Sequence, residues 1–262
     1  MGWMGKVIGG AMGLAVGGPL GMIAGIAFGN LFDRASQYSQ TQNQSIPFGD
    51  NSTTMDHQQQ SQMIFFVGAF SMLARVATAD GRLLPEEQRK VEEFIRDDLK
   101  LDAQGRQAAL RVFNAALTGG GTFEQFATQF YQNFAHEQAI LELMIDVLVR
   151  VGAADGNLNE VEERLIDLAA RLFRISDSLL ASIKRRHVNR TASSEQVYAV
   201  LGLQPDASVE EIKKAYRKLS REFHPDTIAS KGLPEEFTTF AAEKFRAIQD
   251  AYDTIKQQRA IS

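Results

Sequence analysis

An internal repeat at the centre of the sequence limits the folds open to this chain. The segment Met72–Arg89 (MLARVATADGRLLPEEQR) is matched further along by Val147–Arg164 (VLVRVGAADGNLNEVEER). Each copy has an apolar helical pattern, an Ala-Asp-Gly turn and a second helical pattern. The identical pairs are Leu73/Leu148, Arg75/Arg150, Val76/Val151, Ala79/Ala154, Asp80/Asp155, Gly81/Gly156, Leu83/Leu158, Glu87/Glu162 and Arg89/Arg164. The repeat predicts two helix–turn–helix units that pack as pseudo-symmetric halves of one all-α domain.

Local signals support helices on both sides of each turn. Apolar residues three and four apart are typical of amphipathic helices, and two such stripes are Phe66, Phe70, Leu73, Ala77 and Val161, Leu165, Leu168, Leu172. Asn159 and Glu162 form a capping-box pattern, and Pro85 suits a first helical turn. Three glycines at 119–121 separate the halves. We expect six or seven helices over residues 63–183.

The doubled turn, followed in each copy by a glutamate, resembles the TerB-like (tellurite-resistance) family of helical domains. The repeated acids are Asp80, Glu87, Asp155 and Glu162. Three interpretations stay open. The carboxylates converge on a calcium or magnesium ion, or they form turns and cap helices, or they belong to a protein-docking surface. We assign no metal ligand.

The N-terminal segment carries glycine at every fourth position. No residue between Lys6 and Asp33 is charged, and a helix of this length, at about 1.5 Å per residue, exceeds the roughly 30 Å core of a bilayer. Glycines four apart let a second helix approach closely in a membrane, and they are Gly5, Gly9, Gly13, Gly17, Gly21, Gly25 and Gly29. We predict a self-associating transmembrane anchor over residues 1–34. A cleaved secretory signal or a flexible glycine-rich tail is the alternative.

Two polar segments flank the central domain. Residues 35–62 are rich in Gln, Ser, Thr and Asn without an apolar period, which predicts a disordered spacer. Residues 184–194 contain no acidic residue and carry Lys184, Arg185, Arg186 and Arg190. We expect a solvated basic linker there, with contact to phospholipid headgroups as the alternative.

Residues 195–262 predict a short helix followed by two antiparallel helices. Ser208 and Glu211 form a capping box, after which Ile212, Tyr216, Leu219 and Phe223 mark a buried face. This helix ends at His224, because the residue before a proline is pushed out of the helical region. Residues of the final helix are expected to face the first two helices, namely Phe237, Phe240, Phe245, Ile248, Tyr252 and Ile255.

This pattern, with the tripeptide His224-Pro225-Asp226 at the tip and KFxxIxxAYxxI after it, resembles the J-domain family. The resemblance implies a module that has no catalysis of its own, docks onto DnaK-type chaperones and stimulates their ATP hydrolysis. The docking residues it implies are His224, Pro225, Asp226, Lys213, Tyr216, Arg217, Lys218 and Arg221. Long basic side chains on one helix face also suit an acidic partner. Core packing is the alternative for Tyr216, and a DNA-binding helix-turn-helix is the alternative for the basic helix.

Together the three parts resemble a family of bacterial membrane-anchored J-domain co-chaperones over nearly the whole chain. The resemblance implies a single-pass protein of the bacterial inner membrane with its C-terminal domains in the cytoplasm. The glycine spacing adds the expectation of a homodimer. The alternative function is a membrane-surface stress sensor or cation-binding adaptor in which the J-domain is auxiliary.

Composition argues against several other classes. The chain has no cysteine, which excludes disulfides, iron–sulfur clusters and thiol nucleophiles. Its histidines are scattered, and no Walker loop or Ser-His-Asp pattern is legible, so we predict neither an enzyme nor a cofactor. Its 28 basic and 32 acidic residues give a formal net charge of −4, which argues against a nucleic-acid partner.

Overall fold

A computed structural model of the chain describes residues 17–28, 57–188 and 194–259. All regular structure in these ranges is helical, which confirms the all-α prediction. A helical stretch covers residues 18–28. The remaining elements are α3 (His57–Val76), α4 (Pro85–Glu93), the π-helical η1 (Phe94–Asp98), α5 (Ala103–Thr118), α6 (Phe123–Phe134), α7 (Gln138–Gly152), α8 (Glu160–Leu172), α9 (Asp177–Val188), α10 (Ser194–Val200), α11 (Val209–Glu222), α12 (Pro225–Ser230), the 3₁₀ turn η2 (Glu235–Phe237) and α13 (Thr238–Gln258).

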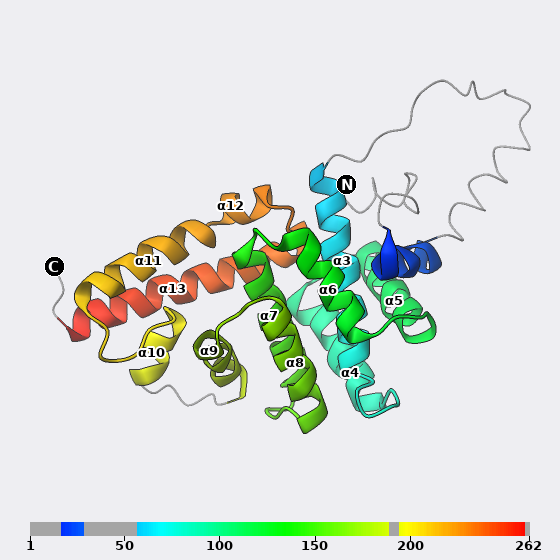
Figure 1. The fold of residues 1–262 in the computed structure, drawn as a ribbon, viewed down its shortest axis with the longest axis horizontal. Helices are drawn as coiled ribbons and strands as arrows, with labels where there is room; N and C mark the ends of the chain where they lie inside the picture. The colour runs from blue at the N-terminus through cyan, green and yellow to red at the C-terminus, as the bar shows by residue number, and fades with distance from the viewer. Residues whose placement is uncertain (1–16, 29–56, 189–193, 260–262) are drawn as a thin grey trace, which may run out of the picture.

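Helix α3 is the centre of the molecule. Every residue from Met63 to Ala74 is buried, so the helix is apolar all round rather than amphipathic. Helices α5, α6 and α7 pack against it (Figure 1). The predicted stripe that contains Phe66 and Leu73 is buried, but so are the other faces of this stretch of the helix.

The two halves of the repeat share their turn geometry. Gly81 and Gly156 have φ angles of +96° and +93°, a conformation that glycine adopts without strain. Each glycine N–H donates to the carbonyl three residues earlier at 2.9 Å. The carboxylates of Asp80 and Asp155 each accept from the backbone N–H two residues later, at 3.3 and 3.1 Å. Both aspartates therefore form the turn that an aspartate before glycine predicts.

The fully buried face of helix α8 is centred beside the predicted apolar stripe. Asn159 and Glu162 form the predicted capping box. The residues that the bundle buries are Ile166, Ala169, Ala170 and Phe173. The predicted stripe is only half-buried, at Val161, Leu165, Leu168 and Leu172. Leu165, Leu168 and Leu172 of the stripe pack against the core at the edge of this buried face.

The central bundle extends beyond its predicted bounds at both ends. Helix α3 begins at His57, inside the expected spacer, and α9 continues to Val188, inside the expected basic linker. Lys184 and Arg186 lie on α9 in ion pairs, at 2.7 Å to Glu163 and to Asp167 for Lys184 and at 3.4 Å to Asp146 for Arg186. These two cations are therefore neither solvated linker residues nor open to lipid headgroups. Residues 35–56 and Arg190 lie outside the described residues.

The C-terminal helices form the predicted antiparallel pair. Helices α11 and α13 lie side by side, with α10 beside α13 (Figure 1). The rings of Tyr216 and Tyr252 stack between them at 4.0 Å. Arg259, just after α13, donates to the Tyr198 hydroxyl at 2.8 Å and to the Ala207 carbonyl at 2.6 Å, which ties the end of α13 to α10 and to the start of α11.

The start of α13 packs against the central bundle. Phe237 meets the rings of Phe65, Phe70 and Phe94 at centroid distances of 4.8, 6.4 and 6.5 Å. The prediction that Phe237 and Phe240 face the C-terminal helices is therefore wrong for Phe237. Phe240 also lies on the bundle side, 5.5 Å from Phe94.

The first turns of helix α3 form hydrogen bonds with the end of α12 and with the connection between α12 and α13. The side-chain amide of Gln58 donates to the Ala229 carbonyl at 3.1 Å, and that of Gln62 to the Leu233 carbonyl at 3.5 Å. The last glutamines of the expected spacer are thus part of the contact between the two helical units.

The helical stretch 18–28 packs on the opposite side of the bundle, beside α5 and α6 (blue in Figure 1). Its side chains Leu20, Ile23 and Phe28 are buried, and Met22 and Ile26 are exposed. The rest of the predicted anchor lies outside the described residues.

Candidate functional site

The basic helix α11 is fixed at its start by a capping box. The Ser208 hydroxyl accepts from the Glu211 N–H at 3.3 Å, and the Glu211 carboxylate accepts from the Ser208 N–H at 2.8 Å. The Ser208 hydroxyl and N–H lower the pKa of the Glu211 carboxyl. An ionised glutamate in the first turn also suits the helix dipole.

His224, Pro225 and Asp226 form an exposed tip after α11. The fully buried Phe223 ends the helix, and His224 adopts φ −59° and ψ 133°, out of the helical region as the following proline requires. Its side chain is 50% exposed and that of Asp226 is 95% exposed. Two polar side chains are therefore presented to solvent from a backbone with restricted freedom.

The imidazole of His224 is oriented by two contacts. Its Nδ1 accepts from the Asp226 N–H at 3.3 Å, and its ring meets the Phe245 ring edge-on at 5.7 Å. A neutral imidazole that accepts at Nδ1 carries its proton on Nε2. The ring therefore offers an N–H donor to a partner.

The predicted basic face leads to this tip. Arg217, Lys218 and Arg221 are exposed, and Lys213 is half-buried. Lys218 lies 3.9 Å from the carboxylate of Glu222, one turn further along the helix. Tyr216 is half-buried and its ring stacks on Tyr252, so part of this side chain packs against α13 and part stays accessible.

Two ion pairs join α13 to the central bundle, and the sequence reasoning missed them. Lys244 pairs with Glu142 of α7, with both side chains almost fully buried. Arg150 of the repeat pairs with Asp98 and with Glu243. The ammonium of Lys244 also lies 5.3 Å from the Phe223 ring, next to the tip. The available signal was the position of Lys244 in the apolar stripe of α13, four residues after Phe240 and four before Ile248.

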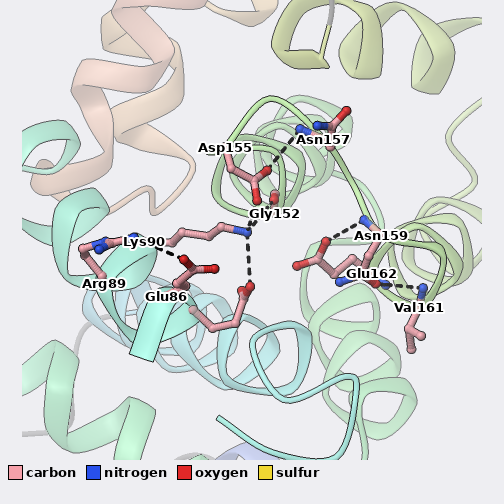
Figure 2. Close-up of polar contacts among 10 residues, drawn as sticks. Glu86, Arg89, Lys90, Gly152, Asp155, Asn157, Asn159, Val161 and Glu162 are labelled. Carbon is pink, nitrogen blue, oxygen red and sulfur yellow. Dashed lines mark hydrogen bonds and ion pairs between the residues drawn. The ribbon is translucent and has the colours of Figure 1, made fainter. Parts of the chain in front are cut away.

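Two of the four repeated acids, Glu87 and Asp155, form ion pairs with a lysine. Figure 2 shows Lys90 of α4 reaching toward the second turn of the repeat. Its ammonium lies 3.1 Å from Asp155, 3.2 Å from Glu87 and 3.4 Å from the Gly152 carbonyl. Asp80 is exposed and bonded to its own turn. Among the described residues no three His, Asp or Glu side chains are grouped to hold a metal ion.

Burial and neighbouring groups shift the pKa values of two side chains in this cluster. Burial lowers the pKa of Lys90, but its hydrogen bonds to Asp155 and Glu87 outweigh burial and raise the pKa above the usual value. Burial raises the pKa of Glu162, and the charges of Glu87 and Asp155 add to that effect. The Glu162 Oε1 atom is buried without a hydrogen-bond partner among the described residues. Within this cluster Glu162 is therefore the acid whose charged form burial disfavours.

Family models match all three parts of the chain. The DnaJ domain matches residues 196–261, which contain the tip and both long C-terminal helices. The model of the tellurite resistance protein TerB matches residues 67–185. The model of the co-chaperone DjlA transmembrane domain matches residues 1–44.

Full-length relatives share this arrangement. The co-chaperone protein DjlA of Vibrio cholerae is 30% identical, with 98% of this chain and 98% of that protein covered. DjlA of Photobacterium profundum is 29% identical over 97% of this chain and 98% of its own length. The chain belongs to the DjlA family. DjlA of Escherichia coli is 26% identical over 90% of both chains, and no solved structure matches.

Membership of the DjlA family confirms the resemblance seen in the sequence. The chain is a membrane-anchored co-chaperone with a J-domain, and a J-domain implies a DnaK-type partner. In the described ranges no helix is both long enough and apolar enough to cross a bilayer. Of the residues matched by the DjlA transmembrane model, the structure describes 17–28.

Proposed function

We propose that the chain recruits a DnaK-type chaperone to the bacterial inner membrane and stimulates its ATP hydrolysis, with no catalysis of its own. In this proposal the docking residues are His224, Pro225 and Asp226 at the tip and Lys213, Tyr216, Arg217, Lys218 and Arg221 on α11. A single-pass anchor within residues 1–34 holds the helical domains on the cytoplasmic side, where the DnaK-type chaperone is found.

The observation that carries this proposal is the exposed tip at the end of a basic helix face. A partner that approaches α11 meets Arg217 and Arg221 and then the imidazole of His224. Exposed cations steer an acidic partner and set its orientation, and the imidazole N–H offers one directional hydrogen bond. These groups bind and orient, and none of them forms a nucleophile–base pair.

Homodimerisation through the glycine-rich anchor is a further part of the proposal. It is supported by the glycine spacing from Gly5 to Gly29, since glycines four apart permit close helix pairing in a bilayer. Replacing Gly9 and Gly13 by leucine should abolish energy transfer between labelled copies in liposomes. Unchanged energy transfer in that variant would contradict pairing through this face.

The function is tested with the full-length protein in liposomes. We expect it to accelerate single-turnover ATP hydrolysis by DnaK, and we expect His224→Gln to abolish the acceleration. The matched control is His136→Gln, since His136 is an exposed histidine of the central bundle. Circular dichroism should be the same for all three proteins, because the His224 side chain is half exposed.

Retained acceleration in His224→Gln would overturn the assignment of the tip. No acceleration by the folded wild-type protein would overturn the proposed function itself. Equal loss in His136→Gln would show that the effect of the histidine substitution is not specific to the tip.

A further inference from the structure

Residues 17–28 occupy a defined place on the central bundle. Leu20 and Ile23 are 0% exposed and Phe28 is 3% exposed. The side-chain amide of Gln129 on α6 both accepts a hydrogen bond from the first turn of this segment and donates one to the residue before it. Its Oε1 accepts from the Leu20 N–H at 2.8 Å, and its Nε2 donates to the Gly17 carbonyl at 2.5 Å.

The surface beneath the segment permits close approach of a helix. We call it the helix seat and define it by Gly68 of α3, Gly119 after α5, and Gln129 and Phe130 of α6. A Cβ atom added at Gly119 would lie 2.9 Å from the Ile23 side chain. One added at Gly68 would lie 3.7 Å from the Leu20 side chain and 2.7 Å from the Phe130 ring. Larger residues at either glycine would force the segment or the ring to move.

The occupant of the seat belongs to the part of the chain that matches a transmembrane domain. Residues 17–28 lie within the match at 1–44, and a helix in the bilayer cannot also fill the seat. Membrane insertion therefore uncovers an apolar surface, which water does not stabilise. It also leaves the amide of Gln129 free to meet another helix.

We propose that the helix seat is a client site that binds an apolar, membrane-type helix of another protein, in competition with residues 17–28. The client helix carries large apolar residues on the face that meets the seat, as Ile23 and Leu20 do against Gly119 and Gly68. It also has an accessible first turn, since Gln129 binds one backbone N–H that a helix start leaves unpaired and the carbonyl of the residue just before the helix. This describes a membrane segment that has not been inserted. The inference rests on the proposed co-chaperone function, because it names the class of client.

Photo-crosslinking of the full-length protein tests the inference. Gly120 is exposed, and a Cβ added there lies 3.4 Å from Met22, so benzoylphenylalanine at this position reports on the seat. The probe is a biotinylated peptide with the sequence of residues 15–30 and a lysine tail. In liposomes of phosphatidylethanolamine and phosphatidylglycerol we expect a crosslink to the peptide. In lipid-free protein we expect a crosslink within the chain, to residues 17–28.

Matched variants distinguish binding at the helix seat from non-specific hydrophobic binding of the peptide. Gln129→Ala should reduce the peptide crosslink several-fold, and Gln107→Ala, an exposed glutamine on α5, should leave it unchanged. A peptide with lysine in place of Ile23 should not crosslink. His224→Gln should crosslink normally, so failure of the client site and failure of the DnaK interaction are distinguishable.

Three results would overturn the inference. A crosslink to lipid alone would show that the bilayer covers the seat. A crosslink to a second copy of the chain alone would show that the seat serves the dimer. A peptide crosslink of equal yield in Gln129→Ala would place the peptide elsewhere.

Discussion

Lys244 of α13 forms an ion pair with Glu142 of α7 across 102 residues of chain, and their side chains are only 2% and 5% exposed. The same ammonium lies over the ring of Phe223, the residue that ends α11 before the His224 tip. This buried charge pair therefore connects the central bundle to the base of the His224 tip.

Removing one member of this ion pair should lower the stability of the folded protein. Lys244→Met leaves Glu142 buried without its partner, and we expect a loss of about 3–5 kcal/mol in the free energy of unfolding. Urea unfolding in detergent, followed by circular dichroism, measures the loss. Lys256→Met, on an exposed position of the same helix, is the control and should change stability little.

The double variant Lys244→Met/Glu142→Met tests the origin of that cost. Buried ion pairs replaced as a unit by apolar residues are often neutral, so the double variant should recover most of the stability. If it is as unstable as the single variant, the loss comes from packing rather than from an unpaired charge.

The two repeat turns should respond alike to alanine. Gly81→Ala and Gly156→Ala each place a Cβ on a residue with φ near +95°, and no other atom lies within 4 Å of that Cβ. The cost is conformational only, and we expect about 1–2 kcal/mol for each. Thermal or urea unfolding of the two variants measures it, and a large difference between them would contradict a shared turn geometry.

Glu162 should make the stability depend on pH. Burial, then the charges of Glu87 and Asp155, raise its pKa in the folded state above the unfolded value of about 4.3. The group therefore favours folding below the unfolded pKa, and this contribution is lost as the pH rises through the folded pKa. Glu162→Gln keeps an acceptor for the Asn159 N–H without the charge.

The measurement is the urea midpoint of wild type and Glu162→Gln at several pH values. Near neutral pH the urea midpoint of the wild type should lie furthest below that of the variant. The difference between the two midpoints should shrink toward about pH 4. Glu160→Gln, an exposed glutamate in the same first turn, should show no such trend. A gap that widens on acidification would reverse the assigned direction of the pKa shift.

Docking through α11 should be sensitive to salt. If the proposed interface is correct, Arg217→Ala and Arg221→Ala should each raise the concentration for half-maximal DnaK stimulation about two- to fivefold, as expected for an exposed ion pair. The effect should shrink at high ionic strength, because exposed charges are screened. Titrations at low and high salt measure this, with Lys256→Ala as the control. Equal effects at both ionic strengths would argue against electrostatic docking.

The tip could be predicted because its causes are local. The capping box at Ser208, the apolar spacing of α11 and the proline after His224 act within a few residues of one another. The same holds for the two Asp-Gly turns, whose hydrogen bonds close within two or three residues.

The domain contact could not be predicted in this way, because its partners are distant in sequence. Phe237 is apolar whichever helices it faces, so periodicity places it in a core without saying which one. The contact between Lys90 and Asp155 could not be predicted for the same reason, since only the fold brings these two residues together. A lysine within an apolar stripe, such as Lys244, indicates a buried acidic partner, but the spacing does not say which residue that partner is.

Helix α3 begins at His57 and holds the α12–α13 connection through Gln58 and Gln62. If the anchor proposed for residues 1–34 spans the bilayer, a mechanical pull from the membrane reaches α3 at this point, before it reaches the phenylalanine-rich centre of the bundle. The hydrogen bonds of Gln58 and Gln62, which lie near the His224–Asp226 tip, would then bear this pull first. The point at which that pull arrives would then lie beside the proposed docking site for the chaperone.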